Sequence, residues 1–308
     1  MSFNEQLYHL IDEALKEDVG DGDHSTLSCI DKDAKGKAVL KIKQEGILAG
    51  VDVAKKIFQY IEPGAEFIAY KKDGDTMAPG EKAFEVLAKV HTILKCERLV
   101  LNCMQRMSGI ATLTKQYTDK LKGYKTRLLD TRKTTPNFRL LEKEAVRIGG
   151  GINHRFGLYD MIMLKDNHID YCGGIEKAIE KADEYVKRHL ASGETNLKIE
   201  VETRNLDDVK KVVAAGKGKV FRIMLDNFKP EQIVEALQLI QGAFETEASG
   251  GINLDNIEEY AKTGVDYVSV GALIHQAQSL DLSLKATSPT LPKEGLQNFQ
   301  NRNYEQEK

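Results

Sequence analysis

The sequence predicts an α/β protein in which a small N-terminal α+β sandwich domain precedes an incomplete, open α/β barrel. Strand-like segments begin near residues 198, 221, 244 and 266, with spacings of 23, 23 and 22 residues, and amphipathic helical patterns fill the intervals. Evenly spaced strand–helix units of this kind build parallel sheets, either an open doubly wound sheet or a barrel. Each strand also ends in polar or charged residues, which is typical of TIM-like barrels, whose active sites lie at the carboxyl ends of the strands.

The N-terminal domain is expected to cover residues 1–115, with 276–286 as a candidate segment to rejoin it. Apolar residues at helical spacing predict a first helix over 3–15, which ends before a turn rich in Gly and Asp. Short β-type segments separated by Gly and Pro then alternate with one helical segment, which indicates an α+β arrangement. These segments are 37–43, 65–70 and 83–88 for strands and 53–61 for the helix.

A long helix is predicted over residues 91–121. Its apolar residues occupy most of the circumference, so the helix requires burial on several sides. Such a helix belongs between domains or between subunits, and Arg98 is conspicuous within it.

The barrel domain is expected to span residues 116–275, and the polar segment 287–308 forms a tail. Between the long helix and the regular repeats, β and α patterns alternate. The predicted elements are strands at 127–131 and 161–165 and helices at 137–148 and 175–189.

Composition excludes several classes of protein. The 308 residues contain 44 Lys and Arg against 47 Asp and Glu, a net charge of −3, so no global positive field attracts nucleic acid or an anionic membrane. Apolar runs fall well short of the ~20 residues that span a bilayer, and the N-terminus lacks a signal-peptide pattern. The four cysteines show no metal-binding spacing and are expected to be reduced and mostly buried. We therefore expect a cytoplasmic protein without nucleic-acid or membrane partners.

Basic residues concentrate where the predicted strands end. Between residues 131 and 168, seven Lys and Arg face four Asp and Glu. Guanidinium groups suit carboxylates and phosphates, and lysines add point charges, so the mixture indicates a ligand with several anionic groups. Plain surface charge is the alternative. The residues expected to share one cavity are Arg132, Lys133, His154, Arg155 and Lys165.

Two glycine-containing turns follow the last predicted strands. Ser249-Gly250-Gly251 follows one strand, and Ser269-Val270-Gly271-Ala272 follows the next. Glycine lets backbone N–H groups approach an oxyanion, and barrels bind phosphate after their last strands. The pair therefore predicts a phosphate site, although tight turns alone would also use small residues.

Carboxylates form a third group. Glu200 and Glu202 share one face of their strand, and Asp226 ends the next strand. Glu202 and Asp226 lie nearer the predicted rim, and oxygen ligands beside phosphates suit Mg²⁺. The alternative is that these carboxylates neutralise Lys and Arg inside the barrel.

Together, these motifs resemble the quinolinate phosphoribosyltransferase family, also called carboxylating nicotinate-nucleotide pyrophosphorylases. The resemblance runs in order through residues 3 to 286. Its strings are residues 17–23 (EDVGDGD), 97–98 (ER), 105–112 (QRMSGIAT), 130–134 (DTRKT), 149–155 (GGGINHR), 164–168 (LKDNH), 200–202 (EVE), 225–228 (LDNF), 249–252 (SGGI) and 268–273 (VSVGAL).

The resemblance implies Mg²⁺-dependent transfer of a phosphoribosyl group from phosphoribosyl pyrophosphate to quinolinate, with loss of CO₂, giving nicotinate mononucleotide and pyrophosphate in de novo NAD biosynthesis. It implies a homodimer in which Arg98 reaches into the partner's site. It places Lys133 between the two substrates, and Glu202 and Asp226 near the ribose and Mg²⁺. The residues it implies for quinolinate are Thr131, Arg132, His154, Arg155 and Lys165, and those for phosphate are Ser249 to Gly251, Ser269 to Ala272 and His275.

Other activities stay open at this stage. A Schiff-base aldolase could use Lys133 or Lys165 beside the same phosphate turns. A non-catalytic phosphosugar-binding regulator would need only the turns and the cations. A related phosphoribosyltransferase could act on another aromatic acid.

Overall fold

The computed structural model describes residues 2–193 and 197–287. The described chain divides into two compact units, the first from residues 2–108 and 279–287, and the second from Gly109–Gln278. The division falls within helix α4 (Val90–Lys120), whereas sequence analysis placed it at residues 115 and 116. Helix α4 continues across this division, so the apolar pattern of its residues does not reveal where the first unit ends. The expected tail 287–308 lies outside the described residues except for Thr287.

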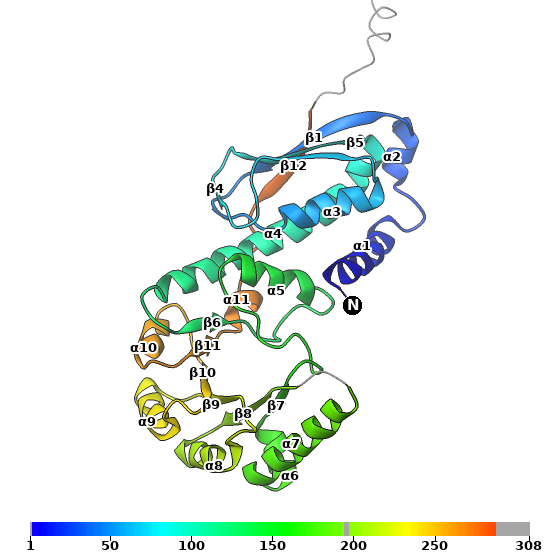
Figure 1. Ribbon diagram of the computed structural model, residues 1–308. Coiled ribbons are helices and arrows are strands. Elements are labelled where there is room, and N and C mark those ends of the chain that lie inside the picture. The colour runs from blue at the N-terminus through cyan, green and yellow to red at the C-terminus, as the bar shows by residue number, and fades with distance from the viewer. Residues whose placement is uncertain (1, 194–196, 288–308) are drawn as a thin grey trace, which may run out of the picture. The chain divides into compact units, whose positions relative to one another are not determined.

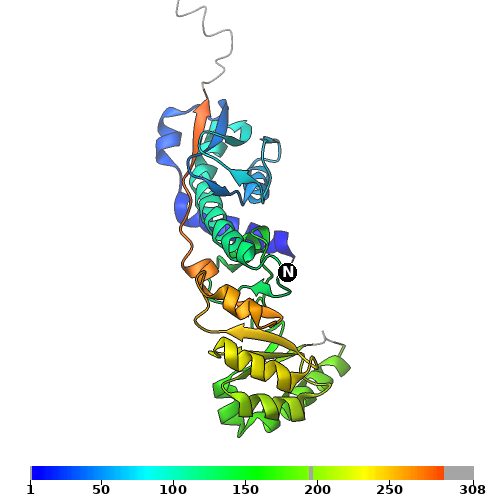
Figure 2. The same ribbon diagram turned by 90° about the vertical axis from the view of Figure 1, so that its left-hand side faces the viewer.

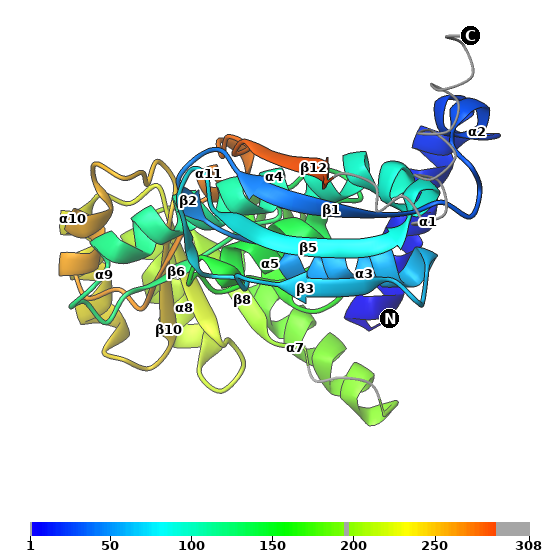
Figure 3. The same ribbon diagram turned by 90° about the horizontal axis from the view of Figure 1, so that it is seen from above.

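The first unit is built on an antiparallel sheet with the strand order β12-β1-β5-β3 (Figure 3). Residues 279–287 therefore return to this unit, where β12 pairs with β1. A short pair, β2 with β4, stands apart from the sheet. The strands are β1 (Lys35–Ile42), β2 (Gly46–Ile47), β3 (Glu66–Ala69), β4 (Thr76–Met77), β5 (Lys82–Lys89) and β12 (Leu282–Thr287).

Helices α1 (Phe3–Val19), α2 (His24–Cys29) and α3 (Val51–Ile61) complete this unit with the beginning of α4. Phe58 of α3 and Phe84 of β5 are fully buried, and their ring centroids lie 6.3 Å apart. Apolar burial between helix and sheet therefore forms the core of the unit. Asp23 caps α2 by accepting the Thr26 N–H, so the turn rich in Gly and Asp leads into a short helix.

The second unit contains a six-stranded parallel sheet with the order β6-β11-β10-β9-β8-β7. The end strands β6 and β7 do not pair with each other within the described residues, so the prediction of an open α/β barrel is confirmed. Figures 1 and 2 show helices α8, α9 and α10 on the outer face of the curved row of strands. Over residues 2–193 and 197–287, no helix is both long and apolar enough to cross a bilayer.

The strands of this unit are β6 (Arg127–Leu129), β7 (Ile162–Leu164), β8 (Ile199–Thr203), β9 (Arg222–Asp226), β10 (Glu245–Ser249) and β11 (Tyr267–Ser269). The helices are α5 (Arg139–Ile148), α6 (Asp166–Cys172), α7 (Ile175–Ala191), α8 (Leu206–Gly216), α9 (Pro230–Ile240), α10 (Ile257–Lys262) and α11 (Ala272–His275).

A buried carboxylate, Asp130, ties three parts of this unit together. It directly follows β6 and accepts hydrogen bonds from Lys143 Nζ of α5 at 2.5 Å, from the His154 backbone N–H at 2.8 Å and from Asn153 Nδ2 at 2.7 Å. Burial raises the pKa of Asp130 and lowers the pKa of Lys143, so each charge depends on the other. The pair thus fixes the loop around His154 to the end of β6.

Breaking this pair should destabilise the second unit. We expect Lys143→Met to cost about 3–5 kcal/mol, because it leaves the Asp130 carboxylate buried without its counter-charge. Urea unfolding followed by circular dichroism measures the change. The matched control is Lys122→Met, which removes an exposed lysine paired with Asp119 and should shift the transition little. Equal shifts in the two variants would contradict the role of Asp130.

Candidate active site

The six parallel strands of the second unit present their carboxyl ends on one rim, and most predicted site residues lie there. A parallel bridge from Ile152 to Leu129 brings the loop that carries His154 and Arg155 beside β6. The other residues follow the strands in turn: Thr131, Arg132 and Lys133 after β6, Lys165 after β7, Glu202 in β8, Asp226 at the end of β9, Ser249 to Gly251 at the end of β10, and Ser269 to Ala272 at the end of β11.

Arg132 and Arg155 are close neighbours with like charge. Burial lowers the pKa of Arg155, and the positive charge of Arg132 lowers it further. Arg155 NH1 donates to the Met161 carbonyl at 3.1 Å, whereas the buried Nε of Arg132 has no hydrogen-bond partner in the described chain. Neither guanidinium forms an ion pair with a described carboxylate, so together they can bind an anionic ligand.

Lys133 joins this basic group to the turn after β11. Its backbone N–H donates to Thr131 Oγ1 at 3.1 Å, which fixes the turn after β6. Its side chain passes close to Gly271, because a Cβ added to Gly271 would lie 2.8 Å from Lys133 Cδ and 3.4 Å from His275 Nε2. Glycine therefore gives Lys133 room to extend over this turn, and Lys133, Gly271 and His275 share one location.

The carboxylates of Glu202 and Asp226 lie on adjacent strands, beside Lys165. Lys165 Nζ forms an ion pair with Glu202. Burial and the negative charge of Glu202 raise the pKa of Asp226, which shows that the two carboxylates repel each other. Oxygen donors held in mutual repulsion fit a divalent cation such as Mg²⁺, which would relieve that repulsion.

The turns after β9 and β10 interlock. Gly250 has φ +94°, and a Cβ at this position would overlap Asn227 Oδ1. The Asn227 N–H donates to the Ser249 carbonyl at 2.7 Å, and Asn227 Nδ2 donates to Asp226 at 2.6 Å. Gly251 has φ +66°, and a Cβ there would meet no atom within 4 Å, so its backbone faces open space. An oxyanion can therefore approach this turn, although the next helix, α10, begins only at Ile257 and lies too far along the chain to cap it.

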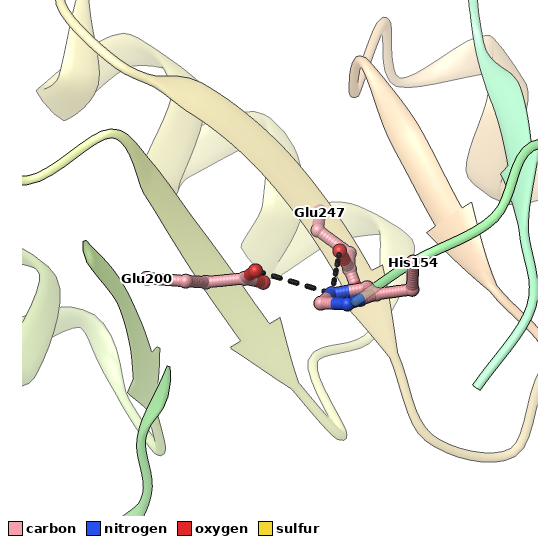
Figure 4. A group of neighbouring side chains, drawn as sticks. All are labelled: His154, Glu200 and Glu247. Carbon is pink, nitrogen blue, oxygen red and sulfur yellow. Dashed lines mark ion pairs between the residues drawn. The ribbon is translucent and has the colours of Figure 1, made fainter. Parts of the chain in front are cut away.

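A buried charged cluster lies deeper among the strands (Figure 4). His154 Nε2 lies 3.1 Å from a Glu200 carboxylate oxygen and 3.2 Å from a Glu247 oxygen, and all three side chains are nearly inaccessible to solvent. Arg222 of β9 completes the cluster, with NH1 3.1 Å from Glu247 and NH2 2.9 Å from Glu245. Two carboxylates are thus neutralised within the protein.

The two ring nitrogens of His154 have different surroundings. The Arg155 backbone N–H donates to Nδ1 at 2.7 Å, so Nδ1 keeps its lone pair and the ring proton belongs on Nε2. Sequence analysis assigned His154 to a substrate carboxylate, and this assignment stays a prediction, because Nε2 faces the two glutamates but has no hydrogen-bond partner in the described chain. The cluster of His154, Glu200 and Glu247 has the donor types of a metal site, but a protonated Nε2 cannot be a ligand, so these residues do not fit a metal ion.

His154 and Glu200 share one proton in addition to the proton on Nε2. Burial opposes a charge on the ring, but the two carboxylates outweigh it and raise the pKa of His154 to about 9. Burial and the charge of Glu247 also raise the pKa of Glu200, to about 7. The imidazole therefore competes with Glu200 for the shared proton.

Sequence reasoning missed several residues that shape this site. Arg222 begins β9 and Glu247 lies in the middle of β10, both with buried side chains, and Glu200 pairs with Arg222 in register across β8 and β9. A charged residue inside a buried strand was the available signal. Arg139 was also missed, although it donates to Thr134 Oγ1 and to the Phe156 carbonyl, both at 2.9 Å. Arg98 lies on α4 in the first unit, and its expected role stays a prediction.

Known proteins share this sequence and architecture. The family description "Quinolinate phosphoribosyl transferase, C-terminal domain" matches residues 110–285, and the corresponding N-terminal domain matches residues 23–108. A chloroplastic nicotinate-nucleotide pyrophosphorylase [carboxylating] of Oryza sativa subsp. japonica is 43% identical over 289 residues, which cover 90% of this chain and 76% of the relative. A probable nicotinate-nucleotide pyrophosphorylase [carboxylating] of Bacillus subtilis (strain 168) is 41% identical over 282 residues, covering 92% of this chain and 94% of the relative.

Solved structures agree in fold. NadC from Streptococcus pyogenes superimposes with a TM-score of 0.83 at 41% identity, covering 92% of this chain and 96% of that chain. The nicotinate-nucleotide pyrophosphorylase from Francisella tularensis gives 0.82 at 38% identity, covering 92% and 97%. With both domains matched in order and the rim residues gathered at the carboxyl ends of the strands, the chain belongs to the quinolinate phosphoribosyltransferase family.

Proposed function

We propose that this protein transfers the phosphoribosyl group of phosphoribosyl pyrophosphate to quinolinate, with decarboxylation, giving nicotinate mononucleotide, pyrophosphate and CO₂. The observation that carries the proposal is the group formed by Arg132, Lys133 and Arg155, which have no ion-pair partner in the described chain and lie on a rim with open glycine turns. Two dianionic or polyanionic substrates need such uncompensated positive charge. Family membership supports the same reaction.

The rim divides naturally between the two substrates. We assign Arg132 and Arg155 to the two adjacent carboxylates of quinolinate, because the charge of Arg132 lowers the pKa of Arg155 and the two cations are therefore neighbours, and Thr131 fixes the turn after β6. Lys165 is available to a carboxylate when it separates from Glu202. The pyrophosphate and the 5′-phosphate belong at Lys133 and the glycine turns, with His275 beside Gly271.

Chemistry follows from this placement. The carboxylate clamps orient the pyridine nitrogen toward the anomeric carbon, and the C–N bond forms as the bond to pyrophosphate breaks. Glu202 and Asp226 stabilise the positive charge that develops on the sugar, and Lys133 neutralises the leaving pyrophosphate. We propose that Glu202 and Asp226 also hold Mg²⁺, which when bound would neutralise further pyrophosphate charge.

Decarboxylation needs little more from the protein. Once the ring nitrogen carries the sugar it is positively charged, so the electron pair left on the neighbouring carbon by departing CO₂ is stabilised by the adjacent charge. That carbon then takes up a proton. The protein holds the ring in place, and the sugar transfer itself supplies the charge that makes carbon–carbon cleavage possible.

Two features of the proposal concern the assembled enzyme and its location. We propose a homodimer in which Arg98 of one protomer reaches the quinolinate site of the other. The cytoplasmic location expected from the sequence stays a prediction, because the printed names of relatives include chloroplastic and mitochondrial forms as well as an unlabelled bacterial one.

A single assay tests the reaction. With quinolinate labelled in its 2-carboxylate, phosphoribosyl pyrophosphate and Mg²⁺, we expect equal amounts of labelled CO₂ and pyrophosphate, and loss of both without Mg²⁺. Pyrophosphate release with another aromatic acid but not quinolinate would contradict the substrate assignment. A borohydride-trapped adduct on Lys133 or Lys165 would instead indicate an aldolase, and binding without turnover would indicate a regulator.

Arg155→Ala should separate the two substrate sites. Removing this guanidinium should weaken quinolinate binding roughly ten- to a hundredfold, because it deletes a charge-assisted hydrogen bond. The affinity for phosphoribosyl pyrophosphate should change much less, as calorimetry would show. Arg147→Ala, which removes an exposed arginine paired with Glu144, is the control. Equal losses for both substrates would refute the assigned role.

Mixed dimers test whether Arg98 acts across the interface. Arg98→Ala and Arg155→Ala homodimers should each be nearly inactive with quinolinate. In an equal mixture of the two variants, half the dimers are hybrids with one intact site, so activity should recover to about one quarter of wild type. No recovery, with hybrid dimers verified by differential tags, would show that Arg98 does not act in the partner's site.

A further inference from the structure

The turn after β9 contains a residue in an unfavourable backbone conformation, Asn227. Its φ is +58°, and among the described residues other than glycine only Asn137 and Gln241 share this left-handed region. Asn227 lies between Asp226, which ends β9, and Phe228, whose side chain is buried. Glycine adopts such a φ at lower cost than any residue with a Cβ. The presence of asparagine therefore indicates that its side chain contributes something that glycine cannot, as is typical of strained residues at functional sites.

The side chain of Asn227 fixes the carboxylate of Asp226. Its Nδ2 donates a hydrogen bond to Asp226 Oδ2 at 2.6 Å, and the Ser249 side chain is a second donor to the same carboxylate. The negative charge of Glu202 opposes this arrangement, because it disfavours the charge of Asp226. The two donors therefore hold the Asp226 carboxylate beside Glu202 against their mutual repulsion.

Asn227 also contacts the glycine turn at the end of β10. Asp226 and Ser249 are opposite each other in register where β9 and β10 end, and the Asn227 N–H donates to the Ser249 carbonyl at 2.7 Å. Asn227 Oδ1 packs so closely against Gly250 that a Cβ on Gly250 would overlap it. One residue thus touches both the carboxylate assigned to the ribose and the turn assigned to a phosphate.

We propose that Asn227 is a positioning residue for phosphoribosyl pyrophosphate. Its side-chain amide orients the Asp226 carboxylate toward the ribose, and its left-handed backbone holds the turn from Ser249 to Gly251 beside that carboxylate. The proposal rests on the proposed function, because it takes phosphoribosyl pyrophosphate to be the ligand of Asp226 and of this turn. Outer partners that orient a ligand-binding carboxylate typically change affinity or activity by roughly ten- to a hundredfold.

Asn227→Gly tests the side chain alone, because glycine keeps the backbone N–H and adopts the same φ without strain. We expect the KM for phosphoribosyl pyrophosphate to rise about tenfold and the KM for quinolinate to stay nearly unchanged. The matched control is Gln241→Gly, which removes another side chain at a left-handed residue, φ +50°, directly after α9. The control should change neither KM. An unchanged KM for phosphoribosyl pyrophosphate in Asn227→Gly, or equal changes for both substrates, would overturn the proposal.

A double-mutant cycle shows whether Asn227 acts through Asp226. In calorimetric titrations of phosphoribosyl pyrophosphate with Mg²⁺, Asn227→Gly should weaken binding about tenfold in the wild type and add little in the Asp226→Ala background. Additive losses would show that the amide acts elsewhere and would overturn the proposal. If the wild-type chain does not turn over quinolinate at all, the proposed function fails instead, so the two failures are distinguishable.

Asn227→Asp covers the case in which the glycine variant does not fold, as circular dichroism would show. Aspartate has nearly the same size and also tolerates the left-handed region, but its ionised carboxylate has no hydrogen to donate to Asp226. We expect the KM for phosphoribosyl pyrophosphate to rise at least tenfold, with the KM for quinolinate nearly unchanged. A wild-type KM for phosphoribosyl pyrophosphate would show that the donated hydrogen bond is not needed and would overturn the proposal.

Discussion

The geometry of the rim depends on a single buried carboxylate, Asp130. Its two oxygens collect the ammonium of Lys143, the amide of Asn153 and the backbone N–H of His154. A buried carboxylate that lost these donors would carry a large desolvation cost, so the strand, the helix and the loop are held in one arrangement. The residues after β6 and the loop with Arg155 therefore meet although they are far apart in sequence.

The charged side chains inside the second unit are paired with opposite charges, whereas two arginines on its rim are not. Arg222 neutralises carboxylates on both neighbouring strands, and Lys143 neutralises Asp130. Arg132 and Arg155, by contrast, form no ion pair with a described carboxylate, and the charge of Arg132 disfavours the charge of Arg155. Folding offsets the cost of the inner charges by pairing them, and only the rim keeps charge available for a ligand.

Sequence reasoning predicted the open barrel, the succession of its strands along the chain and most of the residues on the rim, because strand spacing and polar strand ends are local signals. Helices α6 and α11 were not predicted, because helices of seven and four residues are too short to show a helical period in the sequence. Two members of the buried cluster, Arg222 and Glu247, were also missed, whereas the pairing of Glu200 with a cation inside the barrel was the stated alternative. Glu247 and Arg222 become partners only through the register of β9 and β10, and a single sequence does not show which strands are adjacent.

The contrast between Glu200 and Glu202 shows why residue type alone does not assign a role. They point to the same side of β8, two residues apart, and each faces a cation. Glu200 is fully buried and faces His154 and Arg222, whereas Glu202 lies one step nearer the rim and faces Lys165 and Asp226. A step of two residues along a strand moves a side chain by roughly 7 Å. That distance separates Glu200, whose partners all belong to the protein, from Glu202, whose partner Lys165 can bind a substrate instead. The depth of a carboxylate along β8 therefore decides whether it stabilises the interior or takes part in the reaction.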